Sequence, residues 1–526
     1  MSMIEFIEAL TKQIEEIETK YRNAWWKVAT SGEEGAEKEL KDAQIALRSL
    51  FASKEGFDIL SKSTLDAPLL ERQRIVLLNE FHENQISKEL IAQIVEKEVE
   101  IESIYTNFRP VVDGKPISNN ELKKNLSSSL SVALRQKSWE ASKEMGGQVS
   151  QKVLDLIALR NKAAIEAKFS NFYSMRLKLQ EIDEERLFAL LEELDKLTTP
   201  LWKQYKKTLD EALAKKFQID AAALRPWHYS DPFFQEAPQE AIDLDPFYKD
   251  KDIAKISQEF FKAEGFDVED ILKRSDLYER EKKSQHAFCS CLNRKEDVRI
   301  LCNLKDNEYW MGTQLHELGH AVYDKYIDPS LPYILRCPAH TCTTEAIAML
   351  FGRLSKSPEF LKTYCAVKPE AIDPVAALCH KQNAANLLVF VRWGLVMVHF
   401  ERAMYQQKDV KLNTLWWDLV EKYQEVKRPE KRDLPDWAAK LHLACAPAYY
   451  QNYILGEMTA SQIKAGIEET LAPKKEPFIS SKEVGTYLIK NLFALGASYP
   501  WDETILWATG KPLDPKYFAK DLSILG

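Results

Sequence analysis

Glycine and proline are scarce in this sequence of 526 residues, which contains 17 glycines and 22 prolines. Both residue types interrupt regular helices, whereas the leucine, glutamate, lysine and alanine that are abundant here favour them. The scarcity therefore predicts a mostly α-helical protein. A chain of this length exceeds a usual single domain of about 100 to 200 residues, so we expect two or three lobes and a large core.

A concentration of positive charge is also missing. The formal net charge is −8 and the isoelectric point is near 5.8. A nucleic-acid partner calls for clustered lysine and arginine that neutralise phosphates. We therefore expect no nucleic-acid partner.

Long apolar runs and a leader pattern are absent as well. The first residues include Glu5 and Glu8, where a signal peptide needs a basic start followed by an apolar run. The most apolar later segment, residues 386–400, is interrupted by Arg392 and His399. It falls short of the roughly 18 apolar residues that a membrane span requires. We therefore expect a soluble protein with no membrane partner.

The eight cysteines all lie between residues 289 and 445 and show no paired spacing of the zinc-ribbon kind. Reduced thiols are the simpler interpretation. Together with the missing leader, this predicts a cytoplasmic protein.

Two local features interrupt the helical periodicity. Asp113 and Gly114 stand between short apolar runs and predict a small hairpin. Residues 226–234 contain two prolines and five aromatic side chains. This aromatic loop is interpreted either as packing or as the lining of a binding cleft.

The feature around which the chain is organised is the sequence His-Glu-Leu-Gly-His over residues 316–320. Residues four apart on a helix face the same side, so His316 and His320 would present their imidazoles to one point. Glu317 would stand roughly 100° around the helix, where a carboxylate misses the metal but reaches a water bound to it. A zinc hydrolase needs this arrangement; the alternative is a histidine-rich surface turn.

A catalytic zinc site also needs a third protein ligand, and Glu345 is the best candidate. It follows His320 by 25 residues and lies in an apolar segment that predicts a second helix, with a threonine or Cys342 near its cap. Prolines between the two segments allow the second helix to return beside the first. The alternative is a first-turn glutamate that complements the helix dipole.

These residues together resemble the angiotensin-converting-enzyme family of zinc peptidases, in which a glutamate at about this distance completes the metal site. The stretch from Gln285 to Asn293 is similar to the family's His-Ala-Ser-Ala segment, and Asp297 to Ile300 resembles the strand that follows it. The resemblance implies that main-chain groups of Ala287 hold an extended peptide and that His286 binds a substrate carbonyl.

Downstream, Lys440-Leu-His442 and Tyr450-Gln-Asn-Tyr453 resemble the family's Lys-x-His and Tyr-x-x-Tyr elements. The resemblance assigns Lys440 and Tyr450 to the C-terminal carboxylate of the substrate, and His442 and Tyr453 to the oxyanion. Lys440 and His442 would point to the same side if the chain is extended there. Tyr450 and Tyr453 would share a helix face. Each has an ordinary alternative: a solvated lysine, a core histidine and packing tyrosines.

The chain departs from the family at four positions. Met349 replaces the aspartate that orients the first histidine, so that partner must come from elsewhere, for example a backbone carbonyl. Val420 and Asn452 replace two arginines of the family's chloride sites, so chloride activation is doubtful. Gln285 replaces a cysteine of the animal enzymes, so that disulfide cannot form.

We therefore expect a mostly α, two-lobed, all-helical peptidase with a deep central cleft and a few short strands. Its parts would be an N-terminal helical layer (1–110), a helical arm (111–240), a zinc-binding core (241–370) and a C-terminal helical lobe (371–526), folded as one catalytic unit. The expected activity is the zinc-dependent release of dipeptides from the C-terminus of short peptides, with one zinc ion. The alternatives are a cytosolic endo-oligopeptidase with the same zinc site and a non-catalytic peptide-binding protein. The sequence leaves the oligomeric state open.

Overall fold

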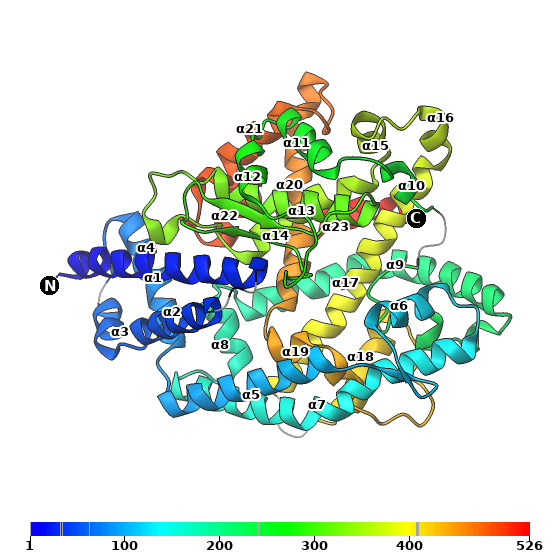
Figure 1. The fold of residues 1–526 in the computed structure, drawn as a ribbon, viewed down its shortest axis with the longest axis horizontal. Helices are drawn as coiled ribbons and strands as arrows, with labels where there is room; N and C mark the ends of the chain where they lie inside the picture. Colours follow the sequence, from blue (N-terminus) through cyan, green and yellow to red (C-terminus); the bar gives the residue numbers. More distant parts are fainter. Residues whose placement is uncertain (1, 32, 34, 63, 239–241, 407–409) are drawn as a thin grey trace. The chain divides into compact units, whose positions relative to one another are not determined.

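The computed structural model describes residues 2–31, 33, 35–62, 64–238, 242–406 and 410–526 (Figure 1). These residues are mostly α-helical, and the strands among them form two small antiparallel sheets of two strands each. The prediction of a mostly helical fold with a few short strands is confirmed. The deep central cleft stays a prediction.

The described chain forms two compact units, and each is assembled from segments that are distant in sequence. Unit 1 comprises Met1–Gln85, Ile242–His380 and Leu455–Phe518, and unit 2 comprises Ile86–Ala241, Lys381–Ile454 and Ala519–Gly526. The chain changes unit inside the long helices α17 (Ala376–Gln406) and α20 (Tyr450–Leu471), and again inside α23 (Pro515–Asp521).

Unit 1 begins with a long amphipathic helix, as the sequence predicts. In α1 (Met3–Ser31) the residues Ile7, Leu10 and Ile14 are buried at spacings of three and four, which places them on one face of the helix. Its other elements are α2 (Ala36–Phe51), α3 (Lys54–Ser61), α4 (Pro68–Glu83), α10 (Asp245–Tyr248), α11 (Ile253–Ala263), α12 (Glu269–Arg274), β3 (Phe288–Cys291), β4 (Val298–Leu301), α13 (Glu308–Lys325), α14 (Thr341–Gly352), α15 (Pro358–Tyr364), α16 (Pro369–Ile372), α21 (Lys482–Asn491) and α22 (Trp501–Thr509).

Two long helices, α7 (Val132–Glu166) and α9 (Glu184–Phe217), dominate unit 2. Side chains cap their first turns, because Ser131 accepts from the Leu134 N–H and Asp183 accepts from the Arg186 N–H. Helix α5 lies beside α7 (Figure 1). The remaining elements are α5 (Lys88–Asn107), β1 (Val111–Val112), β2 (Lys115–Pro116), α6 (Asn119–Ser128), α8 (Phe172–Leu179), α18 (Leu412–Gln424) and α19 (His442–Cys445).

The predicted hairpin is confirmed in unit 2. Val111 pairs with Pro116 and Val112 with Lys115. The two residues between the strands, Asp113 and Gly114, have φ angles of 52° and 76°. Positive φ at both central residues is the requirement of the tight turn that asparagine or aspartate followed by glycine favours.

The segment Pro369–Gln406 is long and apolar enough to cross a membrane by length and composition, and 72% of its most apolar window is buried in the protein. The sequence analysis considered residues 386–400 too short an apolar run to span a membrane, whereas the longer segment meets the criterion of length and composition. Core helices of globular proteins have the same character. Its buried Arg392 is accommodated by an ion pair with Asp195 and a hydrogen bond of 2.8 Å to the Thr198 hydroxyl, both within unit 2.

Candidate metal centre

Helix α13 fixes which way its two histidines point. The side chain of Asn307 caps the helix by accepting from the Trp310 N–H. Met311, Leu315 and Leu318 are fully buried in the core of unit 1. Since these apolar residues occupy the core face, His316 and His320 lie together beside it, with ring centroids 4.9 Å apart. The predicted pairing of the two imidazoles is present.

Helix α14 brings Glu345 to the same point. Its carboxylate oxygen Oε2 lies 3.7 Å from His316 Nε2 and 4.0 Å from His320 Nε2. One ligand atom from each of the three residues lies within 4.8 Å of the other two, a spacing that suits a shared metal ion. The three residues are therefore a candidate zinc site in unit 1.

The start of α14 corrects one detail of the sequence interpretation. The cap residue is His340, whose Nδ1 accepts from the Cys342 N–H, and the Thr343 hydroxyl accepts from the His340 N–H in return. Glu345 is consequently the fifth residue of the helix and lies beyond its first turn. A role in complementing the helix dipole, which acts over the first turn, is therefore disfavoured.

The metal-binding helices touch because glycine stands where they meet. A Cβ atom at Gly319 would lie 2.8 Å from the Ala348 Cα and 3.0 Å from the Ile347 carbonyl oxygen, closer than real Cβ contacts come. A Cβ at Gly352 would lie 3.3 Å from the Cβ of His316. This close approach sets the distance between Glu345 and the two histidines.

Replacing Gly319 with alanine should therefore push α13 and α14 apart. We expect a loss of about 1–3 kcal/mol in the free energy of unfolding, the usual cost of overpacking a core, together with weaker zinc binding. Chemical denaturation and zinc titration measure the two effects. The control is Gly147→Ala, an exposed position in α7 with nothing within 4 Å of the added methyl group. This control should be stabilised by up to about 1 kcal/mol, because alanine is the better helix former. Equal effects of the two substitutions would contradict the packing argument.

A hydroxyl group supports the ring of the second histidine, His320. The Nδ1 atom of His320 lies 2.7 Å from the Thr344 Oγ1. Such a bond fixes the ring and leaves Nε2 to face the metal. Met349 has no polar group to offer His316, and in the described part of the chain no hydrogen bond to the His316 ring is found. Sequence reasoning missed Thr344, although its place next to Glu345 was a usable signal.

Burial shifts the pKa values of the side chains at this site and favours their neutral forms. Burial lowers the pKa of His316 to about 4 and the pKa of His320 well below its usual value, so both imidazoles are neutral at pH 7. Neutral imidazole is the form that binds a metal. Glu317 is 7% exposed, and burial, with a smaller effect of Glu345, raises its pKa to about 8. Two imidazoles and a carboxylate are a donor set that fits zinc.

The predicted strand segment lies in the same unit. Strands β3 and β4 pair antiparallel from Phe288–Leu301 to Cys291–Val298, which confirms the strand expected after residue 297. His286 and Ala287 precede β3 directly, and His286 is exposed. They line an open hollow of about 700 Å³ whose other wall is formed by Trp25, on α1. No second partner strand for β3 is found among the described residues, and the Arg22 side chain on α1 donates to the Cys291 carbonyl at the end of β3.

The other four predicted residues form a cluster in unit 2. The ring of Tyr450 lies 5.2 Å from that of His442 and 5.4 Å from that of Tyr453, centroid to centroid. The Nζ of Lys440 lies 5.6 Å from the centroid of Tyr450. Tyr450 and Tyr453 share a face of α20, as predicted. The condition under which Lys440 and His442 would point to the same side is met only in part: Lys440 is extended, but Leu441 has helical φ and ψ angles and His442 begins α19.

Lys440 has a partner that sequence reasoning missed. Its Nζ donates to the Oε1 of Gln235 over 2.8 Å. Burial lowers the pKa of Lys440 to about 8, and it lowers the pKa of His442 to about 4 with a smaller contribution from the charge of Lys440. A neutral His442 and a largely charged Lys440 at pH 7 suit an oxyanion donor and a carboxylate partner. Gln235 follows the aromatic loop by one residue, so the loop was the available signal.

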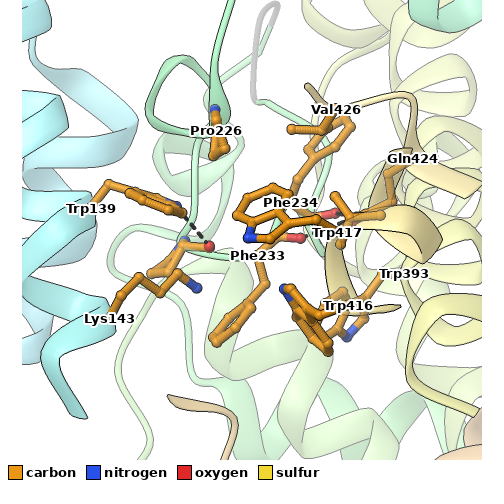
Figure 2. Close-up of a pocket in the computed structure, with 12 residues that line it drawn as sticks. Trp139, Lys143, Pro226, Phe233, Phe234, Trp393, Trp416, Trp417, Gln424 and Val426 are labelled. Atoms are coloured by element: carbon orange, nitrogen blue, oxygen red, sulfur yellow. Dashed lines mark hydrogen bonds between the residues drawn. The ribbon is translucent and has the colours of Figure 1, made fainter. Parts of the chain in front are cut away.

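The aromatic loop packs beneath this cluster. Figure 2 shows Phe233 with Lys143 on one side and Trp393 and Trp416 on the other. The Lys143 Nζ lies 3.2 Å from the Phe233 ring centroid. These side chains line a small cavity of about 20 Å³, which has room for one water molecule, and Val420 lines it too. The loop is therefore packed inside unit 2. It also contacts Lys440, because the Lys440 Nζ lies 5.5 Å from the Phe233 ring centroid and donates to Gln235, the residue after the loop.

Two comparisons with known proteins bear on these residues. The model of a family described as angiotensin-converting enzyme, peptidase family M2, matches residues 1–226 and 236–517. A curated protein of Caenorhabditis elegans, described as inactive angiotensin-converting enzyme-related protein, is 24% identical over 208 residues. That match covers 38% of this chain and 22% of the relative.

Proposed function

The chain belongs to the angiotensin-converting enzyme family of peptidases, family M2, and we propose that it is a zinc peptidase that releases dipeptides from the C-terminus of short peptides. The observation that carries this proposal is the convergence of His316, His320 and Glu345, with one ligand atom of each within 4.8 Å of the others. The relative's description says that it is inactive. Family membership alone therefore does not show that this chain is active. The proposal of activity rests on the residues of this chain.

His316, His320 and Glu345 would hold the zinc ion, which when bound lowers the pKa of water and polarises a carbonyl group. Glu317 is the neighbour of a ligand on α13, at the position from which a carboxylate reaches an attacking water rather than the metal. We assign its charged form the transfer of a proton from that water to the leaving amine; a bound zinc ion would favour the charged form by lowering the raised pKa of Glu317. Thr344 holds the His320 ring in its binding orientation.

The cluster in unit 2 supplies the remaining groups. His442 and Tyr453 would donate hydrogen bonds to the oxyanion, an effect worth on the order of 3 kcal/mol per donor. Lys440 and Tyr450 would bind the free carboxylate of the substrate, and Gln235 holds Lys440 in place. Tyr450 and Tyr453 both lie in the first turn of α20.

His286 and Ala287 would also bind the substrate. Ala287 directly precedes β3, and its main-chain groups would form hydrogen bonds with an extended peptide. The exposed His286 ring is free to bind a substrate carbonyl.

A pair of peptides tests the proposal. The two have the same sequence, and one ends in a free carboxylate and the other in an amide. We expect dipeptide release from the free acid and a value of kcat/KM roughly 10- to 100-fold lower for the amide, because a hydrogen bond to a charged group is lost. Mass spectrometry of the products, with and without chelator, measures both cleavage site and rate.

The other outcomes identify the alternatives. Equal rates on both peptides, with internal cleavage, would replace the proposal with an endo-oligopeptidase that has the same zinc site. Binding of both peptides without chelator-sensitive cleavage would identify a non-catalytic peptide-binding protein.

Chloride should have little effect on this activity. Val420 and Asn452 offer no positive charge where the family has chloride-binding arginines, and Val420 lines an aromatic cavity with room for one water. We expect kcat/KM in sodium chloride and in sodium acetate to agree within about twofold when ionic strength, and hence screening, is matched. A steep rise with chloride would show that another cation, such as the buried Lys143, replaces the missing arginines.

A further inference from the structure

The segment that links His442 to Tyr450 holds an unfavourable backbone conformation. Ala448 is completely buried and has a φ angle of 52°. Left-handed backbone costs an L-residue other than glycine roughly 1–2 kcal/mol. Helix α19, from His442 to Cys445, is too short to fix its own shape. The segment therefore depends on contacts from other helices for its conformation.

One of these contacts comes from Glu401, on the unit 2 part of α17. Its carboxyl oxygen Oε1 accepts a hydrogen bond of 2.7 Å from the Ala448 N–H. Glu401 is 2% exposed. The Gln451 side chain donates to the carbonyl of the same residue. Both backbone groups of Ala448 are thus satisfied while the residue stays in the left-handed region.

A second contact comes from Arg160, on α7. This side chain is 1% exposed, and its Nη2 donates to the Ala444 carbonyl over 2.7 Å. Its other partners are Glu98, at 2.6 Å, and the Tyr405 hydroxyl, at 3.2 Å. Arg160 and Glu401 therefore hydrogen-bond the backbone of the segment at two positions four residues apart, Ala444 and Ala448.

Stability alone does not explain a carboxyl group at position 401. Burial raises the pKa of Glu401 to about 8, so the charged form is penalised in the folded protein. An apolar side chain of similar size would avoid that cost. What an apolar side chain cannot do is accept the hydrogen bond from Ala448.

We propose that Glu401 is a positioning residue that, together with Arg160, holds the segment from His442 to Tyr450 in the shape required to recognise the substrate's C-terminal carboxylate. This inference rests on the function proposed above. Glu401 acts through Ala448 and is assigned no contact with substrate.

Two conservative substitutions separate the length of the side chain from its acid group. Glu401→Asp keeps the carboxyl group but is one methylene group shorter, so it draws back from the Ala448 N–H. Glu401→Gln keeps the length and an acceptor oxygen but replaces the carboxyl group with an amide that does not titrate. The readout is the ratio of kcat/KM for the free-acid peptide to that for its amide. Misfolding lowers the active fraction for both peptides equally and leaves this ratio unchanged.

We expect Glu401→Asp to lower the ratio roughly tenfold, as the loss of well-placed hydrogen bonds to a charged group predicts, with zinc content unchanged. Glu401→Gln should keep the ratio within about threefold of wild type, since the neutral acceptor oxygen remains. Adding Ala448→Gly to Glu401→Asp should restore part of the ratio, because glycine adopts positive φ without a penalty.

A ratio that stays at the wild-type value in Glu401→Asp would overturn the inference, as would a double variant that shows no recovery. A wild-type protein that cleaves both peptides equally would overturn the proposed function first, and the inference with it. The wild-type ratio therefore distinguishes the two failures.

Discussion

Replacing Glu317 with glutamine should reduce kcat by about 10²- to 10⁴-fold, the usual contribution of a positioned acid–base group, while one zinc ion stays bound. Glutamine has nearly the same shape, so the packing of α13 should be preserved. It cannot take a proton from the attacking water. Peptide turnover and zinc content, measured on the same preparation, test this expectation.

The control is Glu370→Gln, the same chemical change at an exposed residue of α16. It should leave both turnover and zinc content at wild-type values. Turnover near the wild-type rate in Glu317→Gln would assign the base to another residue. Loss of zinc from that variant would show instead that Glu317 is a ligand.

Replacing His320 with alanine should remove the zinc ion and all activity. Structural zinc in zinc-finger peptides is held by about 10–16 kcal/mol, divided among four ligands; losing one of three protein ligands should therefore weaken binding by about a thousandfold. The same result is expected for His316→Ala and Glu345→Ala. Metal analysis after dialysis measures it directly.

A substitution with a smaller expected effect is Thr344→Val, which keeps the shape of the side chain but removes the hydroxyl that contacts His320 Nδ1. Outer partners of this kind affect metal affinity by about 10- to 100-fold. We therefore expect Thr344→Val to bind zinc more weakly than wild type and more tightly than His320→Ala. If His320→Ala retained a full equivalent of zinc, the ligand assignment would be wrong.

The sequence predicted those parts of the site that depend on local geometry. The spacing of His316 and His320 is a helical repeat, and the same is true of Tyr450 and Tyr453, so each pair was expected on one face and is found there. Asp113 and Gly114 predicted their turn because few residues tolerate positive φ. Glu345 was proposed as the third ligand from its place in a second predicted helix, and the family resemblance supported the choice, because no local rule connects residues 25 positions apart.

Contacts between distant segments were beyond such reasoning. Gln235 meets Lys440 across 205 residues, and Glu401 meets Ala448 across 47 residues. Neither contact leaves a periodic signal in the sequence. Whether the chain is extended from Lys440 to His442 was left open by the sequence, because two residues do not determine a backbone conformation; Lys440 is extended, and a short helix begins at His442. The assembly of each unit from separate segments could not be predicted either, because it also depends on contacts between distant residues.

The most direct test of the account is a crystal structure of the zinc-loaded protein with anomalous diffraction data collected at the zinc edge. We predict one strong peak, within about 2.0–2.2 Å of one nitrogen each of His316 and His320 and of a carboxylate oxygen of Glu345. A peak held by other residues, or no peak after zinc loading, would contradict the central claim that these three side chains share one metal ion.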